Sequence, residues 1–95
     1  EEIEDKLNNM PYVNESIVIQ ALDGKLAALI YPDFELAFAN GMSEKQVEEQ
    51  MEANRVAVNA QIAAYEQIAR VKIYHEEFEK TPKKSIKRFL YQEAR

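Results

Sequence analysis

Apolar positions follow helical spacing at the start of the chain and form strand-like runs soon after. Ile3, Leu7 and Met10 recur at spacings of four and three, as on one face of an α-helix. Pro11 discourages continuation of that helix. The pattern therefore predicts a short amphipathic helix over residues 1–10.

Two β-branched and aliphatic runs follow, at residues 16–22 and 25–31, with Asp23 and Gly24 between them. Two-residue type I′ turns prefer the Asp-Gly dipeptide because both of their central residues need a positive φ. We therefore predict a β-hairpin with this turn, and a connecting segment over residues 32–41.

A long helix is predicted from Ser43, because Ser43 and Gln46 form a capping-box pattern. It is expected to end between residues 63 and 68. Residues 71–74 then predict a third strand that joins the hairpin. The apolar face of the long helix consists of Val47, Met51, Val58 and Ile62.

The last apolar positions, Ile86, Phe89 and Leu90, are spaced as in a short terminal helix, which follows a polar turn at residues 80–85. Phe89 is expected to lie in the core. Together the elements predict an α+β fold with a small three-stranded sheet, formed by the hairpin plus one later strand and covered by helices.

The composition limits the chain to one small domain. It has 95 residues, of which 46% are apolar, and no cysteine, so it can fold around one modest core without disulfides or a cysteine zinc site. Its longest uninterrupted apolar run, residues 26–31, is far shorter than the roughly 18 residues of a membrane span. We expect a soluble domain without a transmembrane segment.

Charge is distributed unevenly along the chain. Residues 1–54 hold 3 basic and 12 acidic side chains, a net of −9, whereas residues 55–95 hold 9 basic and 5 acidic ones, a net of +4. Lysines can reach a phosphate or stabilise developing negative charge, although they could also merely offset an acidic protein. One turn and the segment after it hold five cations, Lys80, Lys83, Lys84, Lys87 and Arg88.

Other candidate chemistry is sparse. The single histidine, His75, cannot build a multi-histidine metal site, and with two glycines the chain has no Gly-rich phosphate loop. Glu76, Glu77 and Glu79 are expected to form a solvated charge run, and Ser85 to be a helix N-cap. No metal site is predicted, and self-contained catalysis is not expected.

Several segments together resemble the C-terminal domain of AMP-forming acyl-CoA synthetases, and long-chain fatty acid ligases most closely. The opening residues are similar to that family's Pro-x-Glu-Ile-Glu helix, and residues 11–18 match its P-x-V-x-x-x-x-V step. Thr81 and Pro82, with the lysines and arginine that follow, fit its T-P-x-x-K-x-x-R turn. Because residues 1–4 have the sequence expected of a first helical turn, we expect a piece of a longer protein without the family's hinge.

The resemblance implies that residues 1–95 form a small lid on a large N-terminal adenylation domain of the same protein, which would bind the fatty acid, ATP and Mg²⁺. A lysine on the lid's turn would reach the carboxylate and the α-phosphate during adenylate formation. The opposite face of the lid would then help form the thioester with CoA, the second substrate. The full-length protein would be a cytoplasmic acid–thiol ligase, and the isolated fragment is expected to be inactive.

One position departs from the family pattern. The family's lysine aligns with Ser85, whose hydroxyl cannot supply the same charge, whereas a shift of one residue would place Lys84 there. The predicted catalytic residues are therefore Lys84 and, as the next candidate, Lys87, and Lys83 and Arg88 are predicted to bind substrate. Weakened adenylation, or a basic group from the large domain, are the alternatives.

Two alternative functions do not involve catalysis. The basic terminal segment could serve a nucleic-acid-binding module, although the net charge of −5 argues against nucleic acid as a partner. The long helix at residues 43–62 could instead form a protein-interaction seam through Val47 or Met51.

Overall fold

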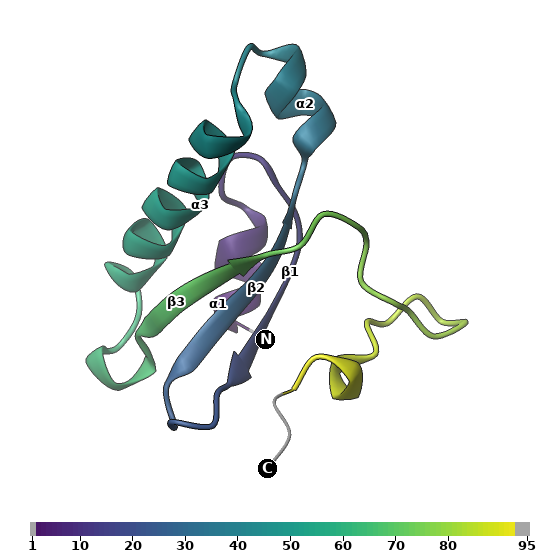
Figure 1. Cartoon of the computed structure of the whole chain (residues 1–95). Coiled ribbons are helices and arrows are strands. Elements are labelled where there is room, and N and C mark those ends of the chain that lie inside the picture. Colours follow the sequence, from purple (N-terminus) through teal and green to yellow (C-terminus); the bar gives the residue numbers. More distant parts are fainter. Residues whose placement is uncertain (1, 93–95) are drawn as a thin grey trace.

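The fold is given by a computed structural model that describes residues 2–92. Its sheet has the order β1 (Val13–Gln20), β2 (Leu26–Pro32) and β3 (Ile68–Ile73), with β1 antiparallel and β3 parallel to the central strand β2. The predicted α+β fold, a hairpin plus one later strand, is confirmed. Along the chain, the elements are α1 (Glu2–Asn8), β1 (Val13–Gln20), β2 (Leu26–Pro32), α2 (Phe34–Ala39), α3 (Glu44–Asn59), the 3₁₀ turn η1 (Ala64–Glu66), β3 (Ile68–Ile73) and the 3₁₀ turn η2 (Arg88–Leu90) (Figure 1).

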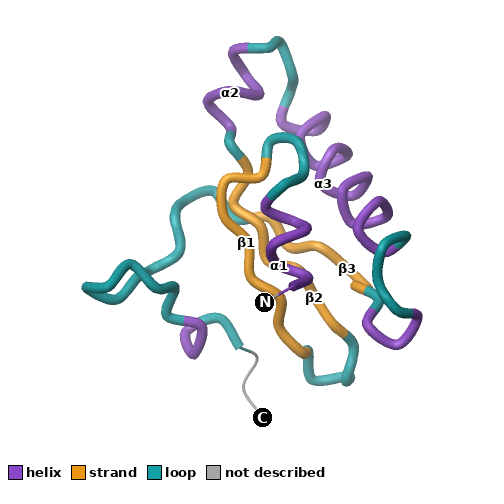
Figure 2. The backbone as a smooth tube through the Cα atoms, turned by 180° about the vertical axis from the view of Figure 1, so that it is seen from behind, coloured by secondary structure: helices purple, strands orange, loops and turns teal. Residues whose placement is uncertain are grey.

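Strand β2 lies at the centre of the sheet, and its alternating side chains contribute to two cores. Ala28 and Ile30 belong to one core, which also contains Leu7, Met51, Val58 and Ile68. Helices α1 and α3 cover this face of the sheet, as Figure 2 shows from behind. The other core contains Ala27, Leu29, Ile17, Ile19 and Phe78, so the segment after β3 covers the second face. The expectation that helices cover the sheet therefore holds for one face only.

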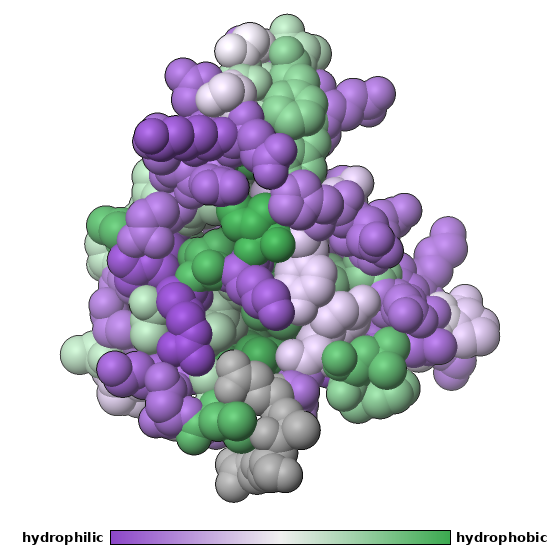
Figure 3. All heavy atoms as spheres, in the orientation of Figure 1, coloured by the Kyte–Doolittle hydropathy of each residue, from purple (hydrophilic) through white to green (hydrophobic). Residues whose placement is uncertain are grey.

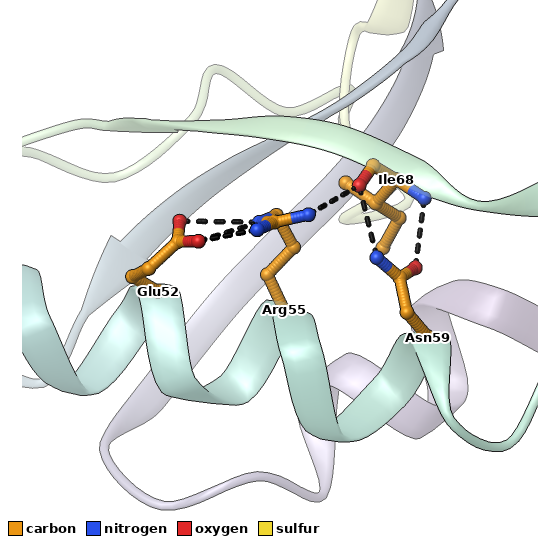
Figure 4. Close-up of polar contacts among 4 residues, drawn as sticks. All are labelled: Glu52, Arg55, Asn59 and Ile68. Carbon is orange, nitrogen blue, oxygen red and sulfur yellow. Dashed lines mark hydrogen bonds and ion pairs between the residues drawn. The ribbon is translucent and has the colours of Figure 1, made fainter.

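Helix α3 carries β3 to the parallel side of β2, since a parallel pair needs a long crossover connection. Asn59 forms two hydrogen bonds with the backbone of Ile68, the first residue of β3. Its Nδ2 donates to the Ile68 carbonyl at 3.0 Å, and its Oδ1 accepts from the Ile68 N–H at 2.8 Å (Figure 4). Arg55 donates to the same carbonyl at 2.8 Å, while Glu52 holds its guanidinium. The strand thus begins three residues before the predicted start, and α3 ends before residue 63 because the chain needs residues 60–67 to turn back.

The start of α3 is as predicted. The Gln46 N–H donates to Ser43 Oγ at 3.2 Å, and the Ser43 N–H donates to Gln46 Oε1 at 2.8 Å, which completes the capping box. Val47 and Met51 are fully buried within the domain, which contradicts the alternative interpretation of a protein-interaction seam through them. Among the described residues, no helix has the length and apolar character needed to cross a bilayer.

The hairpin between β1 and β2 is confirmed, but the predicted type I′ turn is wrong. Ala21 donates its N–H to the Lys25 carbonyl at 2.8 Å, and Gly24 donates to the Ala21 carbonyl at 2.9 Å. Within this loop the positive φ is at Gly24, at 85°, whereas a type I′ turn needs two in succession. The loop therefore has three residues and places its glycine in the left-handed conformation.

The predicted connecting segment contains the helix α2, which the sequence analysis missed. Asp33 caps it by accepting a hydrogen bond from the Leu36 N–H at 3.1 Å. The predicted terminal helix is reduced to the single turn η2, and the placement of Phe89 in the core is wrong, because its side chain is 72% exposed.

Candidate functional site

The segment after β3, residues 74–92, is called the C-terminal arm below. Phe78, which is 2% exposed, attaches it to the sheet by packing in the second core with residues of β1 and β2. The Phe78 ring centroid also lies 5.1 Å from that of Tyr74 and 5.0 Å from that of Tyr91. Tyr91 also accepts a hydrogen bond from the Glu79 N–H at its hydroxyl, at 2.8 Å. Aromatic packing thus replaces regular secondary structure in holding the arm.

The polar turn predicted at residues 80–85 is the tip of a small hairpin within the arm. Thr81 donates its N–H to the Ser85 carbonyl at 2.8 Å, and Lys84 donates to the Thr81 carbonyl at 2.8 Å. Pro82 stands just after Thr81, where its fixed φ suits a turn. Ser85 is therefore part of a hairpin, and its predicted role as a helix N-cap is wrong.

This loop repeats the bonding of the loop between β1 and β2, with Lys84 in the place of Gly24. Lys84 has a φ of 66°, a left-handed conformation that side chains other than those of Gly, Asn and Asp rarely adopt. The backbone of Lys84 is therefore strained, and such strain occurs often at functional sites.

An ion pair anchors the start of the arm to strand β1. The Glu15 carboxylate accepts a hydrogen bond from the Phe78 N–H at 3.1 Å and pairs with the Lys80 ammonium. The hydrogen bond from Lys80 to Glu15 raises the pKa of Lys80 above its usual value, and desolvation only partly opposes this. Lys80 is thus committed to a contact within the domain.

A second ion pair anchors the end of the arm. Glu4 of α1 is 5% exposed, pairs with the Arg88 guanidinium through both carboxylate oxygens, and accepts from the Val18 N–H at 2.7 Å. Burial alone would raise the pKa of Glu4, but the hydrogen bonds from Arg88 and Val18 and the charge of Arg88 outweigh it and hold this pKa below its usual value. Arg88, predicted to bind substrate, thus contacts a carboxylate of its own domain.

Three of the five clustered cations remain available for a ligand. Within residues 2–92, the structure gives Lys83, Lys84 and Lys87 no ion pair. Lys83 and Lys84 are exposed at the hairpin tip, whereas Lys87 is half-buried and donates its N–H to the Glu79 carbonyl at 2.8 Å. The arrangement can present two ammonium groups to an anion.

Neither anchoring carboxylate was predicted from the sequence, although each has a sequence signal. Glu4 lies three residues before Leu7, on the apolar face of its helix, and Glu15 interrupts a strand in which the next residues are buried. Acidic residues at such positions rarely stay unpaired. The signal indicates a partner but does not identify it.

His75 lies outside the hairpin. Its ring stacks on Phe34 with centroids 5.0 Å apart, and its Nε2 lies 3.0 Å from a carboxylate oxygen of Glu44. Glu76, Glu77 and Glu79 are exposed, and they border a hollow of about 430 Å³. In the described part of the chain, no three carboxylate or histidine side chains are grouped so that they could hold a metal ion.

The geometry defines a small α+β domain that presents a lysine-tipped hairpin on an anchored arm, and comparison with known proteins places this domain in a family. A family profile described as the AMP-binding enzyme C-terminal domain matches residues 1–94. The chain belongs to this family of C-terminal domains, as the sequence resemblance indicated. A comparison with curated proteins gave no match.

Solved structures share the fold. The adenylation domain of a carboxylate reductase from Mycobacterium chelonae has a TM-score of 0.76 at 15% identity and covers 95% of this chain, which spans 15% of that one. ATP-bound MatB from Rhodopseudomonas palustris has a TM-score of 0.60 at 20% identity, and the match covers 95% of this chain and 16% of MatB. A fatty acyl-CoA synthetase from Mycobacterium tuberculosis has a TM-score of 0.56 at 23% identity, and the match covers 95% of this chain and 16% of the synthetase. This chain therefore corresponds to a small part of each of these proteins.

Proposed function

We propose that residues 1–95 are the mobile lid of an AMP-forming acyl-CoA synthetase of the long-chain fatty acid class. Its large N-terminal domain binds the fatty acid, ATP and Mg²⁺, and the lid acts on the adenylate and then on CoA. The family match supports this proposal, as do the descriptions of two similar structures as an ATP-bound enzyme and a fatty acyl-CoA synthetase. The long-chain class is supported by the spacing of residues 86–90.

The hairpin tip carries the proposal for the site. Lys80 and Arg88 neutralise carboxylates of the domain, so the cation that meets the acyl adenylate comes from Lys83, Lys84 or Lys87. Lys84 is the proposed catalytic residue. Its side chain is exposed, it precedes Ser85, the position of the family's lysine, and its backbone has the left-handed φ of 66° at the end of the loop. Its ammonium stabilises negative charge on the carboxylate and the α-phosphate as a carboxylate oxygen attacks the α-phosphorus of ATP, the bond between the α- and β-phosphates breaks and pyrophosphate leaves. Lys83 adds charge beside it.

The test is acid-dependent pyrophosphate exchange by the full-length protein. Lys84→Gly removes the ammonium but suits the left-handed backbone, so it separates the charge from the loop's geometry. We expect adenylation to fall by roughly a hundredfold or more, and Lys84→Arg to retain part of it. Lys83→Ala is the neighbouring charge control and is expected to have a smaller effect.

A second variant tests the alignment. Ser85→Lys in the Lys84→Gly background restores a lysine at the family's position and is expected to recover adenylation. Unchanged exchange in Lys84→Gly, with a loss in Lys87→Ala, would show that Lys87 is the catalytic residue instead. Tight, steeply salt-dependent binding of the chain to an oligonucleotide would favour the nucleic-acid-binding alternative.

A further inference from the structure

Two adjacent residues of η2 expose large apolar side chains beside the hairpin. Phe89 is 72% exposed and Leu90 is 47% exposed. Figure 3 shows hydrophobic atoms over η2, next to hydrophilic atoms of the hairpin on the same face of the molecule. The flanking residues Arg88 and Tyr91 instead contact Glu4 and the aromatic rings of the arm. Because Arg88 and Tyr91 contact the rest of the domain, the side chains of Phe89 and Leu90 between them are left exposed to solvent.

The hairpin tip and η2 are parts of one anchored unit. The Lys80–Glu15 pair fixes the start of this unit and the Arg88–Glu4 pair fixes its end. Between them, Lys87 donates its N–H to the Glu79 carbonyl at 2.8 Å, which closes the hairpin immediately before η2. The lysine tip and the side chains of η2 are therefore held in a fixed position relative to one another.

We propose that Phe89 and Leu90 form a docking surface for the large N-terminal domain, used in the orientation in which the hairpin tip reaches the adenylate. This inference rests on the proposed function, which supplies that domain as the partner. Charge complementarity sets the orientation, since the cationic tip faces the anionic adenylate while the apolar pair packs on the neighbouring protein surface. Aromatic residues, Phe among them, are enriched in protein interfaces relative to the rest of the surface.

The experiment uses the full-length protein, with and without palmitoyl sulfamoyl adenosine, a nonhydrolysable mimic of the acyl adenylate. Hydrogen–deuterium exchange of residues 79–91 reports docking, and pyrophosphate exchange reports adenylation. We expect the mimic to slow deuterium uptake in the wild type, and the double variant Phe89→Ser/Leu90→Ser to lose this protection and about tenfold or more of its pyrophosphate exchange. The control Val56→Ser changes a residue on α3 that is 55% exposed, and it is expected to behave as wild type.

The outcomes separate the two proposals. Protection and pyrophosphate exchange that survive the double substitution overturn the docking surface and leave the proposed function standing. Protection that is lost in the double variant, with exchange unaffected by Lys84→Gly, supports the surface and refutes the role of Lys84. A protein that neither binds the mimic nor exchanges pyrophosphate overturns both. Flotation with phosphatidylglycerol vesicles that the double substitution abolishes, without protection by the mimic, overturns docking and assigns the surface to an anionic membrane.

Discussion

The ion pair between Glu4 and Arg88 can be tested through stability. Arg88→Met keeps the apolar part of the side chain but removes the guanidinium. The buried Glu4 carboxylate then loses both hydrogen bonds from Arg88 and keeps the one from the Val18 N–H. Breaking a buried ion pair costs about 3–5 kcal/mol. The Arg88 side chain is 42% exposed, however, so water already screens part of the interaction. We expect the free energy of unfolding to fall by about 1–2 kcal/mol.

Urea unfolding of the 95-residue chain measures this loss, and a double-mutant cycle isolates the pair. Glu4→Gln retains an oxygen that can accept from the Val18 N–H while removing the charge. The cycle of Arg88→Met and Glu4→Gln is expected to give a coupling energy of about 1 kcal/mol. A coupling energy indistinguishable from zero would show that Arg88 does not stabilise the arm through Glu4.

The pair also has a defined pH dependence. Burial acts to raise the pKa of Glu4, but the hydrogen bonds of its carboxylate hold the pKa below the usual 4.5 in the folded chain. A group with a lowered folded pKa stabilises the fold above its unfolded pKa, and this stabilisation is lost as the pH falls through the folded value. The stability gap between wild type and Arg88→Met should therefore shrink below about pH 4.5. A gap that stays constant from pH 7 to about pH 3.5 would refute the reasoning.

Three further substitutions probe the backbone and the cores. Lys84→Gly is expected to be more stable than Lys84→Ala by about 1 kcal/mol in urea unfolding, because both lose the ammonium but glycine alone suits the left-handed φ. Equal stability of the two variants would show that the backbone at this position is not strained. Asn59→Ala removes both bonds to Ile68 and should cost about 2 kcal/mol in thermal unfolding, with the exposed Gln61→Ala as a neutral control. Phe78→Ala should cost about 3–5 kcal/mol, since its ring joins the arm to the sheet, and a loss below about 1 kcal/mol would show that the arm is not part of the cooperative unit.

Local signals in the sequence were sufficient for much of the fold. The capping box at Ser43, the apolar face of α3 and the hairpin runs were all predicted, because each depends on residues within a few positions of one another. The cluster of cations at the candidate site was visible for the same reason. The missed helix α2 also had a local signal, the capping residue Asp33.

The use of the cations was decided only by the tertiary structure. Arg88 meets Glu4 across 84 positions of sequence, and the Phe78 N–H meets Glu15 across 63, so no local pattern could show that these contacts form. The same applies to Phe89, which helical spacing placed in the core and which the inward contacts of its neighbours leave exposed. Periodicity records which residues share a face, whereas contacts between distant segments depend on the path of the whole chain.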